Sequence, residues 1–478
     1  MALGIIHNEN EIYENLRSLS CCKRCCLRYL GERDSSSYIN VNETLKQKGL
    51  ESDKEDDYEP EHKIFKPNPC ISFVRKIYAI ITDVLTASYD CDIFTCALSL
   101  PISYQLRSHS LWLHLMDKFP VPFESEDLHQ ETHVISVKEA WKWTIAPVIA
   151  KAINKELDSG VNSDFFVGIN VSYTGDEYEC SCLLEMHADI FKIRKTQKRK
   201  YHGNLYTRKA LFMIMSPCSH NSIFIAGRYN KFSRMLSQTP WVIDGERRME
   251  SSVQEIICES LQTVSRSEGV KFSASGREDV DVRTLGRGRP FVCELVNPHR
   301  MKFTFEQVQN LQTNINKNSS DVAVRDLQFV NKDELGNLKT GEEKKMKRYM
   351  ALCICNAHIK SEVLERLSSM KDITLNQKTP IRVLHRRPLA TRSRVVHSMR
   401  AWMLENPTKV CKKEGVTLFK LDIKTQAGTY IKEFIHGDFG RTQPSLGHLL
   451  DGVSVDILAL DVEDIELDWP PAVNYLHG

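Results

Sequence analysis

Apolar and polar residues follow two different periods in the first half of the chain. CDIFTCALSLPIS (91–103) and FFVGINVSY (165–173) place apolar residues at alternate positions, which is typical of strands with one buried face. ISFVRKIYAIITDVL (71–85) repeats them every three or four residues, which predicts a helix. This mixture of periods predicts an α/β domain over about residues 70–240.

The pattern changes after Trp241. MESSVQEIICESLQTV (249–264) has the spacing of an amphipathic helix. GVKFSASG (269–276) reads as a strand that runs into a turn. Three further strands are predicted, namely RPFVCELV, MALCICNAHI and GVTLFKLDIKTQ. We therefore expect a second domain of strands, helices and arginine-rich loops, with its boundary at 235–245.

The N-terminal region divides into two parts. Residues 1–33 carry a helical pattern that ends in SCCKRCCLRYLG. Residues 34–62 are predicted to be a linker, because SDKEDDYEPEHK is acidic, contains a proline and has too few apolar residues to bury a core.

Composition narrows the class of protein. A chain of 478 residues is long enough for two or three domains, and 41% hydrophobic residues allow a sizeable core. A net charge of +2 gives no global attraction to nucleic acid or membrane, so any such attraction must be local. We expect no membrane span and no signal peptide. Fifteen cysteines then predict an intracellular protein with mostly free thiols.

The stretch SASGREDVDVRTLGRGRPF (273–291) concentrates charge between glycines. Glycine permits positive φ, so both ends can turn tightly. An arginine beside an aspartate can hold the carboxylate ionised or bind a phosphate. Two interpretations stay open at this point: a solvated turn with internal ion pairs, or a catalytic loop that grips a polyanion.

Two tyrosines favour the second interpretation. Tyr349 lies where an apolar strand begins, beside Lys347 and Arg348, and Tyr430 precedes a helix-like run that contains Lys432. Either tyrosine alone is more typical of a protein core. Aromatic rings beside cations also suit an unstacked base and its phosphates, so together with the loop they indicate nucleic acid.

These motifs resemble those of a known enzyme family. SASGREDVDVRTLGRGRPF, KRYMALC, PIRVLHRRPLA and TQAGTYIKEFIHGDFGRT, with GRYNKFSR in the first half, are similar to the Pus-ten type of tRNA pseudouridine synthases of archaea and eukaryotes. The resemblance covers most of the chain. It implies that uridine in RNA is isomerised to pseudouridine: the base is detached, rotated and rejoined through carbon.

The resemblance also implies roles for individual residues. It places the essential aspartate at Asp279, with Asp281 as the nearest rival, and leaves open whether the carboxylate attacks the sugar or removes a sugar proton. It implies that Tyr349 packs on the target base and that Tyr430 lines its pocket. It further implies that Lys432 forms an ion pair with the catalytic aspartate and that Arg277 contacts RNA. Arg441 is an alternative partner for that ion pair.

The expected organisation follows from these matches. We expect an α/β (α+β) protein with an N-terminal segment (1–75), a THUMP-containing RNA-binding domain (76–240) and a pseudouridine synthase catalytic domain with a mixed, mainly antiparallel sheet (241–478). The resemblance implies a monomer that acts on tRNA, at uridines 54/55 of the TΨC arm, without a catalytic cofactor. We expect it in cytoplasm and nucleus, with mitochondria as an alternative. The alternative function is an RNA-binding partner of microRNA precursors and their processing machinery, with catalysis dispensable.

Cysteines and basic runs complete the expectations. Cys22 and Cys25 form a C-x-x-C, half of a tetrahedral zinc site. The family binds a structural zinc, and Cys70 matches a third ligand, but Pro67 stands at the fourth position. Cys180, Cys182, Cys218 and His220 form a second candidate metal set, for which buried free thiols are the preferred interpretation. Two basic runs, 192–209 and 382–394, are expected to contact phosphates.

Overall fold

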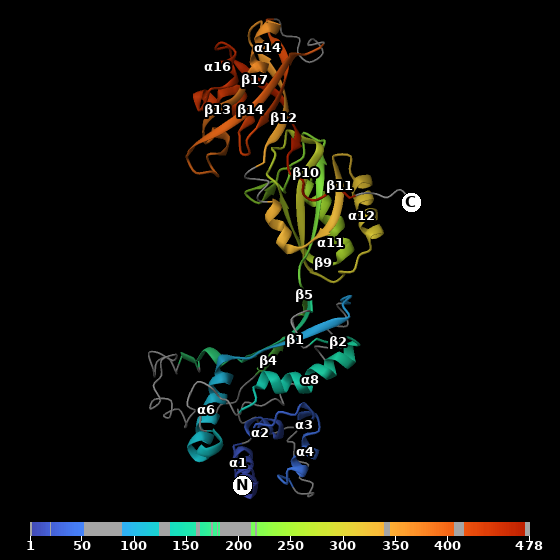
Figure 1. Ribbon diagram of the computed structural model, residues 1–478, viewed down its shortest axis with the longest axis vertical. Helices are drawn as coiled ribbons and strands as arrows, with labels where there is room; N and C mark the ends of the chain where they lie inside the picture. Colours follow the sequence, from blue (N-terminus) through green and yellow to red (C-terminus); the bar gives the residue numbers. More distant parts are fainter. Residues whose placement is uncertain are drawn as a thin grey trace. The chain divides into compact units, whose positions relative to one another are not determined.

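The computed structural model divides the chain into two compact units, Met1–Asn221 and Ser222–Gly478 (Figure 1). It describes residues 2–19, 21–51, 88–123, 134–158, 163–173, 175–178, 180–181, 212–215, 218–338, 345–405 and 415–473. The division falls earlier than the boundary predicted at 235–245. Residues 223–231 form a strand of the second unit's sheet, where they pair with two strands that lie later in the chain.

The first unit combines helices with a small mixed sheet. Its described helices and strands are α1 (Ala2–Ser18), α2 (Lys23–Tyr29), α3 (Ser35–Ile39), α4 (Val41–Gln47), β1 (Ile93–Ser99), α6 (Ile102–Lys118), α7 (Pro120–Phe123), α8 (Val137–Ile153), β2 (Glu156–Leu157), β3 (Phe165–Tyr173), β4 (Phe212–Met215) and β5 (Cys218–His220). The sheet has the order β2-β1-β3-β4, with β5 also paired to β3. The strands predicted at 91–103 and 165–173 are confirmed as β1 and β3.

The predicted linker is wrong over its first part. Residues 35–47 form α3 and α4, and the Asp34 carboxylate caps α3 by accepting a hydrogen bond from the Ser36 backbone N–H. Tyr38 and Leu45 are fully buried. These two apolar side chains anchor a segment whose other residues are mostly polar. The acidic run that indicated a linker begins at residue 52 and lies outside the described residues. The predicted helix at 71–85 also lies outside them.

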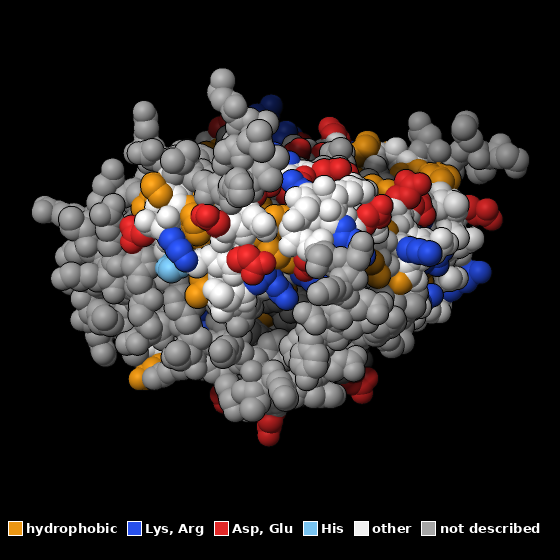
Figure 2. Space-filling model, turned by 90° about the horizontal axis from the view of Figure 1, so that it is seen from below, with side chains coloured by type: hydrophobic (Ala, Val, Ile, Leu, Met, Phe, Trp, Pro, Cys, Tyr) orange, Lys and Arg blue, Asp and Glu red, His pale blue; other side chains and the backbone are white. Residues whose placement is uncertain are grey.

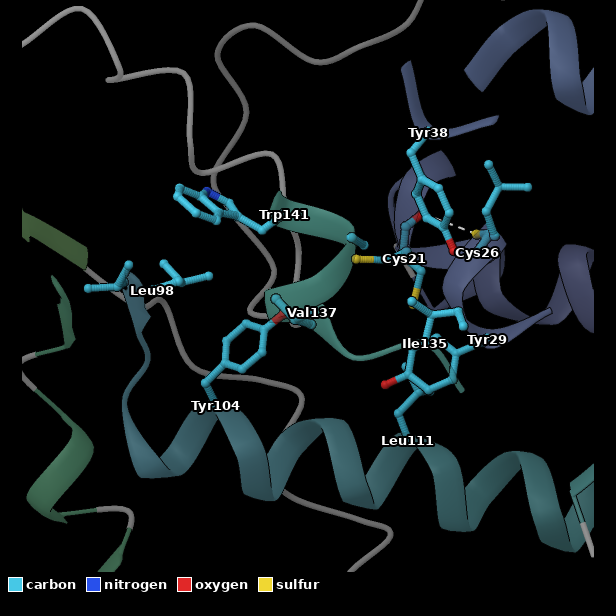
Figure 3. Close-up of a cluster of buried hydrophobic side chains, with 14 of the residues drawn as sticks. Cys21, Cys26, Tyr29, Tyr38, Leu98, Tyr104, Leu111, Ile135, Val137 and Trp141 are labelled. Atoms are coloured by element: carbon cyan, nitrogen blue, oxygen red, sulfur yellow. Dashed lines mark hydrogen bonds between the residues drawn. The ribbon is translucent and has the colours of Figure 1, made fainter. Parts of the chain in front are cut away.

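A single apolar cluster fills the core of the first unit. Figure 3 shows side chains from the N-terminal helices, β1, α6 and α8 meeting in it. Aromatic rings supply much of the buried area, and Trp112 and Trp141 are both at most 1% exposed. The thiols of Cys21 and Cys26 lie among them. The N-terminal helices are therefore part of the core of this unit.

The second unit is built on one large twisted sheet. Its described strands are β6 (Ile223–Lys231), β7 (Val242–Ile243), β8 (Glu246–Arg247), β9 (Ser267–Ala274), β10 (Val282–Pro298), β11 (Val322–Val330), β12 (Lys347–Cys355), β13 (Lys371–Lys378), β14 (Thr391–Met403), β15 (Thr417–Thr425), β16 (Thr442–Gln443) and β17 (Val455–Ile465). Ten of them form a sheet of order β11-β6-β10-β17-β12-β15-β14-β13-β16, with β9 on β10. β10 and β17 are parallel and the other neighbouring strands of this sheet are antiparallel, which confirms the mixed, mainly antiparallel sheet.

Helices cover parts of this sheet. They are α11 (Val253–Ser265), α12 (Phe305–Asn318), α14 (Ser361–Ser369), α15 (Ile431–His436) and α16 (Leu446–Leu449), with 3₁₀ turns η4 (Lys332–Leu335), η5 (Ile381–Val383) and η7 (Gly437–Gly440). Figure 1 shows α11 and α12 beside β9, β10 and β11. The predicted helix at 249–264 is confirmed as α11. It begins at Val253 because the Ser252 hydroxyl caps it by accepting from the Glu255 N–H.

Two apolar clusters hold this unit together. One joins α11 and α12 to β6, β9, β10 and β11. The other joins α14, α15 and α16 to β12, β13, β14, β15 and β17, with further side chains from β6 and β10. Most candidate residues of this unit lie in three segments: the β9–β10 loop, η5 between β13 and β14, and α15 after β15. Tyr349 lies on β12. Across the described ranges, no helix combines the length and apolar character needed to cross a membrane.

Candidate active site

Near its start the β9–β10 loop contains a glycine, and any other residue at this position would be strained. Gly276 has φ +89°, and a Cβ there would come within 2.8 Å of Lys347 Nζ and 3.1 Å of an Arg289 guanidinium nitrogen. The tight turn predicted at this end is therefore present. The other end differs from the prediction: Gly286 and Gly288 also have positive φ, but they lie inside β10, at a bulge between Thr284 and Arg289.

A network of buried polar side chains holds the β9–β10 loop in place. The Glu278 side chain is fully buried and lies 2.7 Å from Arg289 Nε in an ion pair. The Tyr229 hydroxyl lies 2.9 Å from both Glu278 oxygens, and Gln238 Nε2 donates to Tyr229 Oη and to the Gly276 carbonyl. Burial, together with the Glu278 carboxylate, raises the pKa of Tyr229 well above its usual value. Because each member has a partner, the network fixes the residue that precedes Asp279.

Lys231 holds the backbone at Asp279 itself. Its Nζ, at the end of β6, donates to the carbonyls of Leu236 at 2.8 Å, Asp279 at 3.1 Å and Val280 at 2.7 Å. The residue is fully buried. Burial lowers its pKa to about 8, although nearby carboxylates act in the opposite direction. A buried ammonium therefore fixes the main chain that presents the Asp279 carboxylate.

The Asp279 carboxylate faces solvent between two cations. Its side chain is 33% exposed. An Arg382 guanidinium nitrogen lies 2.9 Å and 3.0 Å from its two oxygens, and Lys432 Nζ lies 3.4 Å from one of them. The structure thus brings Lys432 to Asp279 as predicted, but Arg382 is the closer cation. Arg441, the predicted alternative, pairs instead with Asp438 at 3.6 Å and donates to the Thr379 carbonyl.

Asp281, the rival for the catalytic role, has a different environment. Lys432 Nζ lies 2.7 Å from both of its oxygens, and the Asp281 side chain is 62% exposed. Partial burial acts to raise the pKa of Asp281, but the bond to Lys432 outweighs it and the pKa is lowered. Lys432 therefore joins the two aspartates and lies closer to Asp281.

Arg382 is the site residue that sequence reasoning missed. It is the first arginine of the basic run 382–394, which we expected to contact phosphates as a whole. It lies in η5, and its Nε is 2.6 Å from an oxygen of the buried Glu433 on α15. Five arginines occur in that run, and no local pattern separates this one from the others.

The predicted aromatic residues lie close to this loop. Tyr349, on β12, is half-buried; burial raises its pKa to about 12, with Arg289 opposing and Glu278 adding to the rise. Tyr430 is half-buried at the start of α15, where its backbone N–H and carbonyl both bond the Gln377 amide. Arg277 is exposed at the top of the loop. Their predicted contacts with RNA are proposals at this stage.

Two of the expected zinc ligands, Cys22 and Cys25, lie among the described residues. Cys22 is the N-cap residue of α2, and Cys25 is buried in the following turn, where an Arg28 nitrogen lies 3.9 Å from its sulfur. Burial and the neighbouring thiols raise the pKa of Cys21 and Cys26. The third expected ligand, Cys70, lies outside the described residues. Within the described ranges, three or more His, Cys, Asp or Glu side chains do not gather in a metal-holding group.

The other cysteine and basic candidates are less complete. Cys180 lies in a short helical segment. Cys218 and His220 lie on β5, and Cys182 is outside the described residues, as is the basic run 192–209. On the face in Figure 2, the described Lys and Arg side chains are interspersed with Asp and Glu. That view therefore shows no extended basic patch over the described residues.

Comparisons with known proteins agree along most of the chain. Residues 224–466 match the family model described as "Pus10, C-terminal", and residues 70–225 match "Eukaryotic Pus10, N-terminal". The tRNA pseudouridine synthase Pus10 of Mus musculus is 39% identical over 468 residues, covering 91% of this chain and 85% of that protein. The putative tRNA pseudouridine synthase Pus10 of Drosophila melanogaster is 34% identical, with 97% and 98% covered.

A solved structure gives a much weaker likeness. A Cbf5-Nop10-Gar1 complex aligns with 49% of this chain and 47% of the matched chain, at 16% identity and a TM-score of 0.25. A score this low carries no argument about function.

Proposed function

This chain belongs to the Pus10 family, and on that basis we propose that it isomerises uridine to pseudouridine in the TΨC arm of tRNA, at position 54 or 55. Relatives that match 91% and 97% of the chain are named tRNA pseudouridine synthase and putative tRNA pseudouridine synthase. The observation that carries the proposal is the placement of Asp279: a partly exposed carboxylate on a fixed loop, beside Arg382 and Lys432.

The chemistry explains why such a carboxylate is useful. The N1–C1′ bond of uridine breaks, the base rotates, and a C5–C1′ bond forms while C5 loses a proton and N1 gains one. Atoms balance without an external oxidant or reductant, so we propose no catalytic cofactor. Asp279 attacks C1′ or removes a ribose proton, and both roles need a carboxylate aimed at the sugar. Its fixed backbone supplies that aim.

The target base must first leave its stack, at a cost of a few kcal/mol. We propose that Tyr349 packs on the flipped base, that Tyr430 lines the same space, and that Arg277 contacts the neighbouring RNA. The half-buried positions of both tyrosines support this, because each ring is fixed by the protein and still partly accessible. Lys432 and Arg382 would offset the charge that RNA phosphates bring close to Asp279.

Site-resolved pseudouridine mapping on tRNA transcripts tests the proposal. The wild-type protein is expected to modify the TΨC arm, Asp279→Ala to bind tRNA and modify nothing, and Asp281→Asn to retain activity. Wild-type protein that binds several tRNAs and leaves every uridine unchanged would refute catalysis and favour the RNA-binding alternative. Modification by Asp279→Ala with none by Asp281→Asn would move the catalytic role to Asp281.

Structural zinc is a separate part of the proposal. Cys22 and Cys25 would supply two thiolates, with Cys70 as a third ligand, and the ion would fasten α2 to a later segment of the chain. Metal analysis of the purified protein tests this directly. A zinc content near one per chain that falls in Cys25→Ser supports the site, and a content near zero in wild type rejects it.

A further inference from the structure

Arg382 joins two carboxylates that differ sharply in exposure. Toward solvent it contacts Asp279, which is 33% exposed, through one terminal nitrogen. Toward the interior it contacts Glu433, which is 2% exposed, through Nε at 2.6 Å and the other terminal nitrogen at 3.5 Å. The guanidinium therefore uses all three nitrogens, and its inner partner is held by the core.

The Glu433 carboxylate is directed at Arg382. It follows Lys432 on α15, but Lys432 turns toward Asp281 while Glu433 turns toward Arg382. Its neighbours on the helix, Ile431 and Phe434, are buried. A carboxylate placed among apolar side chains is unfavourable unless it is paired, and its pairing fixes the orientation of the partner. Here the partner is the cation on Asp279.

We propose that Glu433 is a positioning residue for the catalytic aspartate: it orients Arg382, whose outer nitrogen then holds the Asp279 carboxylate toward the ribose. This inference rests on the proposed function. Glu433 touches neither substrate nor Asp279 and acts only through Arg382. The planar guanidinium is required, because a lysine ammonium does not span two carboxylates with the same fixed fork.

Single-turnover rates on tRNA labelled at uridine C5 test this, with tRNA affinity measured in parallel. Glu433→Gln is expected to lower the rate ten- to a hundredfold and to change affinity by less than about twofold, as for a misplaced catalytic group. Asp422→Asn is the matched control, because Asp422 accepts three hydrogen bonds from Arg348 elsewhere in the sheet. Its rate should stay within about twofold of wild type.

Combining the substitutions separates positioning from general stabilisation. If Glu433 acts through Arg382, Glu433→Gln lowers the rate no further in an Arg382→Ala background. Multiplicative losses would overturn the proposal, and so would a wild-type rate in Glu433→Gln. A wild-type protein that modifies no tRNA would instead refute the proposed function.

Variants at the exposed partner keep the test decisive if Glu433→Gln fails to fold. The single-turnover rate of Arg382→Lys is expected to be at least tenfold below that of wild type. Added guanidinium ion is expected to restore part of the rate of Arg382→Ala. A wild-type rate in Arg382→Lys would show that charge alone suffices, and the positioning role of Glu433 would be wrong.

A second feature lies beside the same segment. Phe439 is 94% exposed, and both it and Asp438 have left-handed backbone conformations, with φ +54° and +48°. Bulky residues rarely adopt this conformation, and it persists only where neighbours impose it. Asp438 is held by the Ile381 N–H at 3.3 Å and by Arg441 at 3.6 Å. The turn is thus fastened to the residue before Arg382.

We propose that Phe439 stacks on an unpaired nucleobase of the bound tRNA. An aromatic ring that is almost fully exposed gains nothing by burial in the folded protein, yet strained backbone presents it on the turn that is fastened to Ile381, next to Arg382. Bases have apolar faces that stack on such rings regardless of sequence. This inference also rests on the proposed function, and it concerns binding only.

Affinity for tRNA and single-turnover rate at saturating enzyme separate the outcomes. Phe439→Ala and Phe439→Leu are each expected to weaken binding roughly five- to a hundredfold, the range for one stacked base, with the saturated rate unchanged. Phe439→Trp should bind as wild type, and so should Phe305→Ala, a control at a 62% exposed phenylalanine on α12. Wild-type affinity in Phe439→Leu would overturn stacking.

Discussion

Lys231→Met tests whether the buried ammonium under the β9–β10 loop is needed for catalysis. A pKa of about 8 in place of 10.5 corresponds to a penalty of roughly 3 kcal/mol for burying the charge at neutral pH. Methionine removes that penalty. It also removes the donor from three carbonyls, of which the Asp279 carbonyl keeps a hydrogen bond from the Val282 N–H. The other two cost about 1–3 kcal/mol each when left without a donor.

The removed burial penalty and the lost hydrogen bonds nearly cancel in the free energy of unfolding. They do not cancel in the reaction rate, which depends on the position of Asp279. We expect the free energy of unfolding of Lys231→Met to lie within about 3 kcal/mol of wild type. The main chain on both sides of Asp279 loses its common anchor, so the single-turnover rate is expected to fall at least tenfold while tRNA affinity is kept. Lys271→Met, at an exposed lysine on β9, is the control and should change neither. A rate within twofold of wild type in Lys231→Met would refute the reasoning.

The pH dependence of the wild-type protein gives an independent check, because the rate is expected to fall with pH while the free energy of unfolding is expected to rise. A neutral amine has two N–H donors for three carbonyls, so the wild-type rate is expected to fall as pH rises through about 8. The folded protein holds this proton less tightly than the unfolded chain, so unfolding takes up a proton between pH 8 and 10.5. The unfolding free energy of wild type should therefore rise over this window relative to Lys231→Met. An alkaline fall in rate that is equal in both proteins would contradict this assignment.

Two further changes test the frame around the site and a third tests the core of the first unit, each by chemical unfolding. Glu278→Gln leaves Arg289 buried without its counter-charge and should cost about 3–5 kcal/mol; a loss below 1 kcal/mol would show that the network is dispensable. Gly286→Ala places a Cβ 2.0 Å from the Glu463 carbonyl and should destabilise the β10–β17 pairing, whereas Gly269→Ala, with open space, should not. Burial raises the pKa of Cys96 from 9.0 to about 12, so its contribution to stability is present below pH 9 and lost toward pH 12; Cys96→Ala should lack that loss.

The sequence determined the local elements and the chemistry of the loop. Period-two and helical spacing located β1, β3 and α11, because one buried face leaves its period in the chain. The glycine before Arg277 marked the turn, since positive φ there excludes most side chains. Motif resemblance along the chain identified the family, which the family models and relatives then showed.

Tertiary structure alone decided which side chains meet. Arg382 and Asp279 are 103 residues apart, and their contact depends on how the η5 segment and α15 pack, which no local pattern encodes. Lys231 appears in the sequence only as part of the GRYNKFSR motif, and its burial against the Asp279 and Val280 carbonyls is what makes it an anchor. Likewise, the polar composition of the segment that forms α3 and α4 predicts a linker. Two buried side chains, Tyr38 and Leu45, are enough to order it, because the folded unit supplies a core in which they pack. Local periodicity reports which face is buried, and only the packed fold determines what that face is buried against.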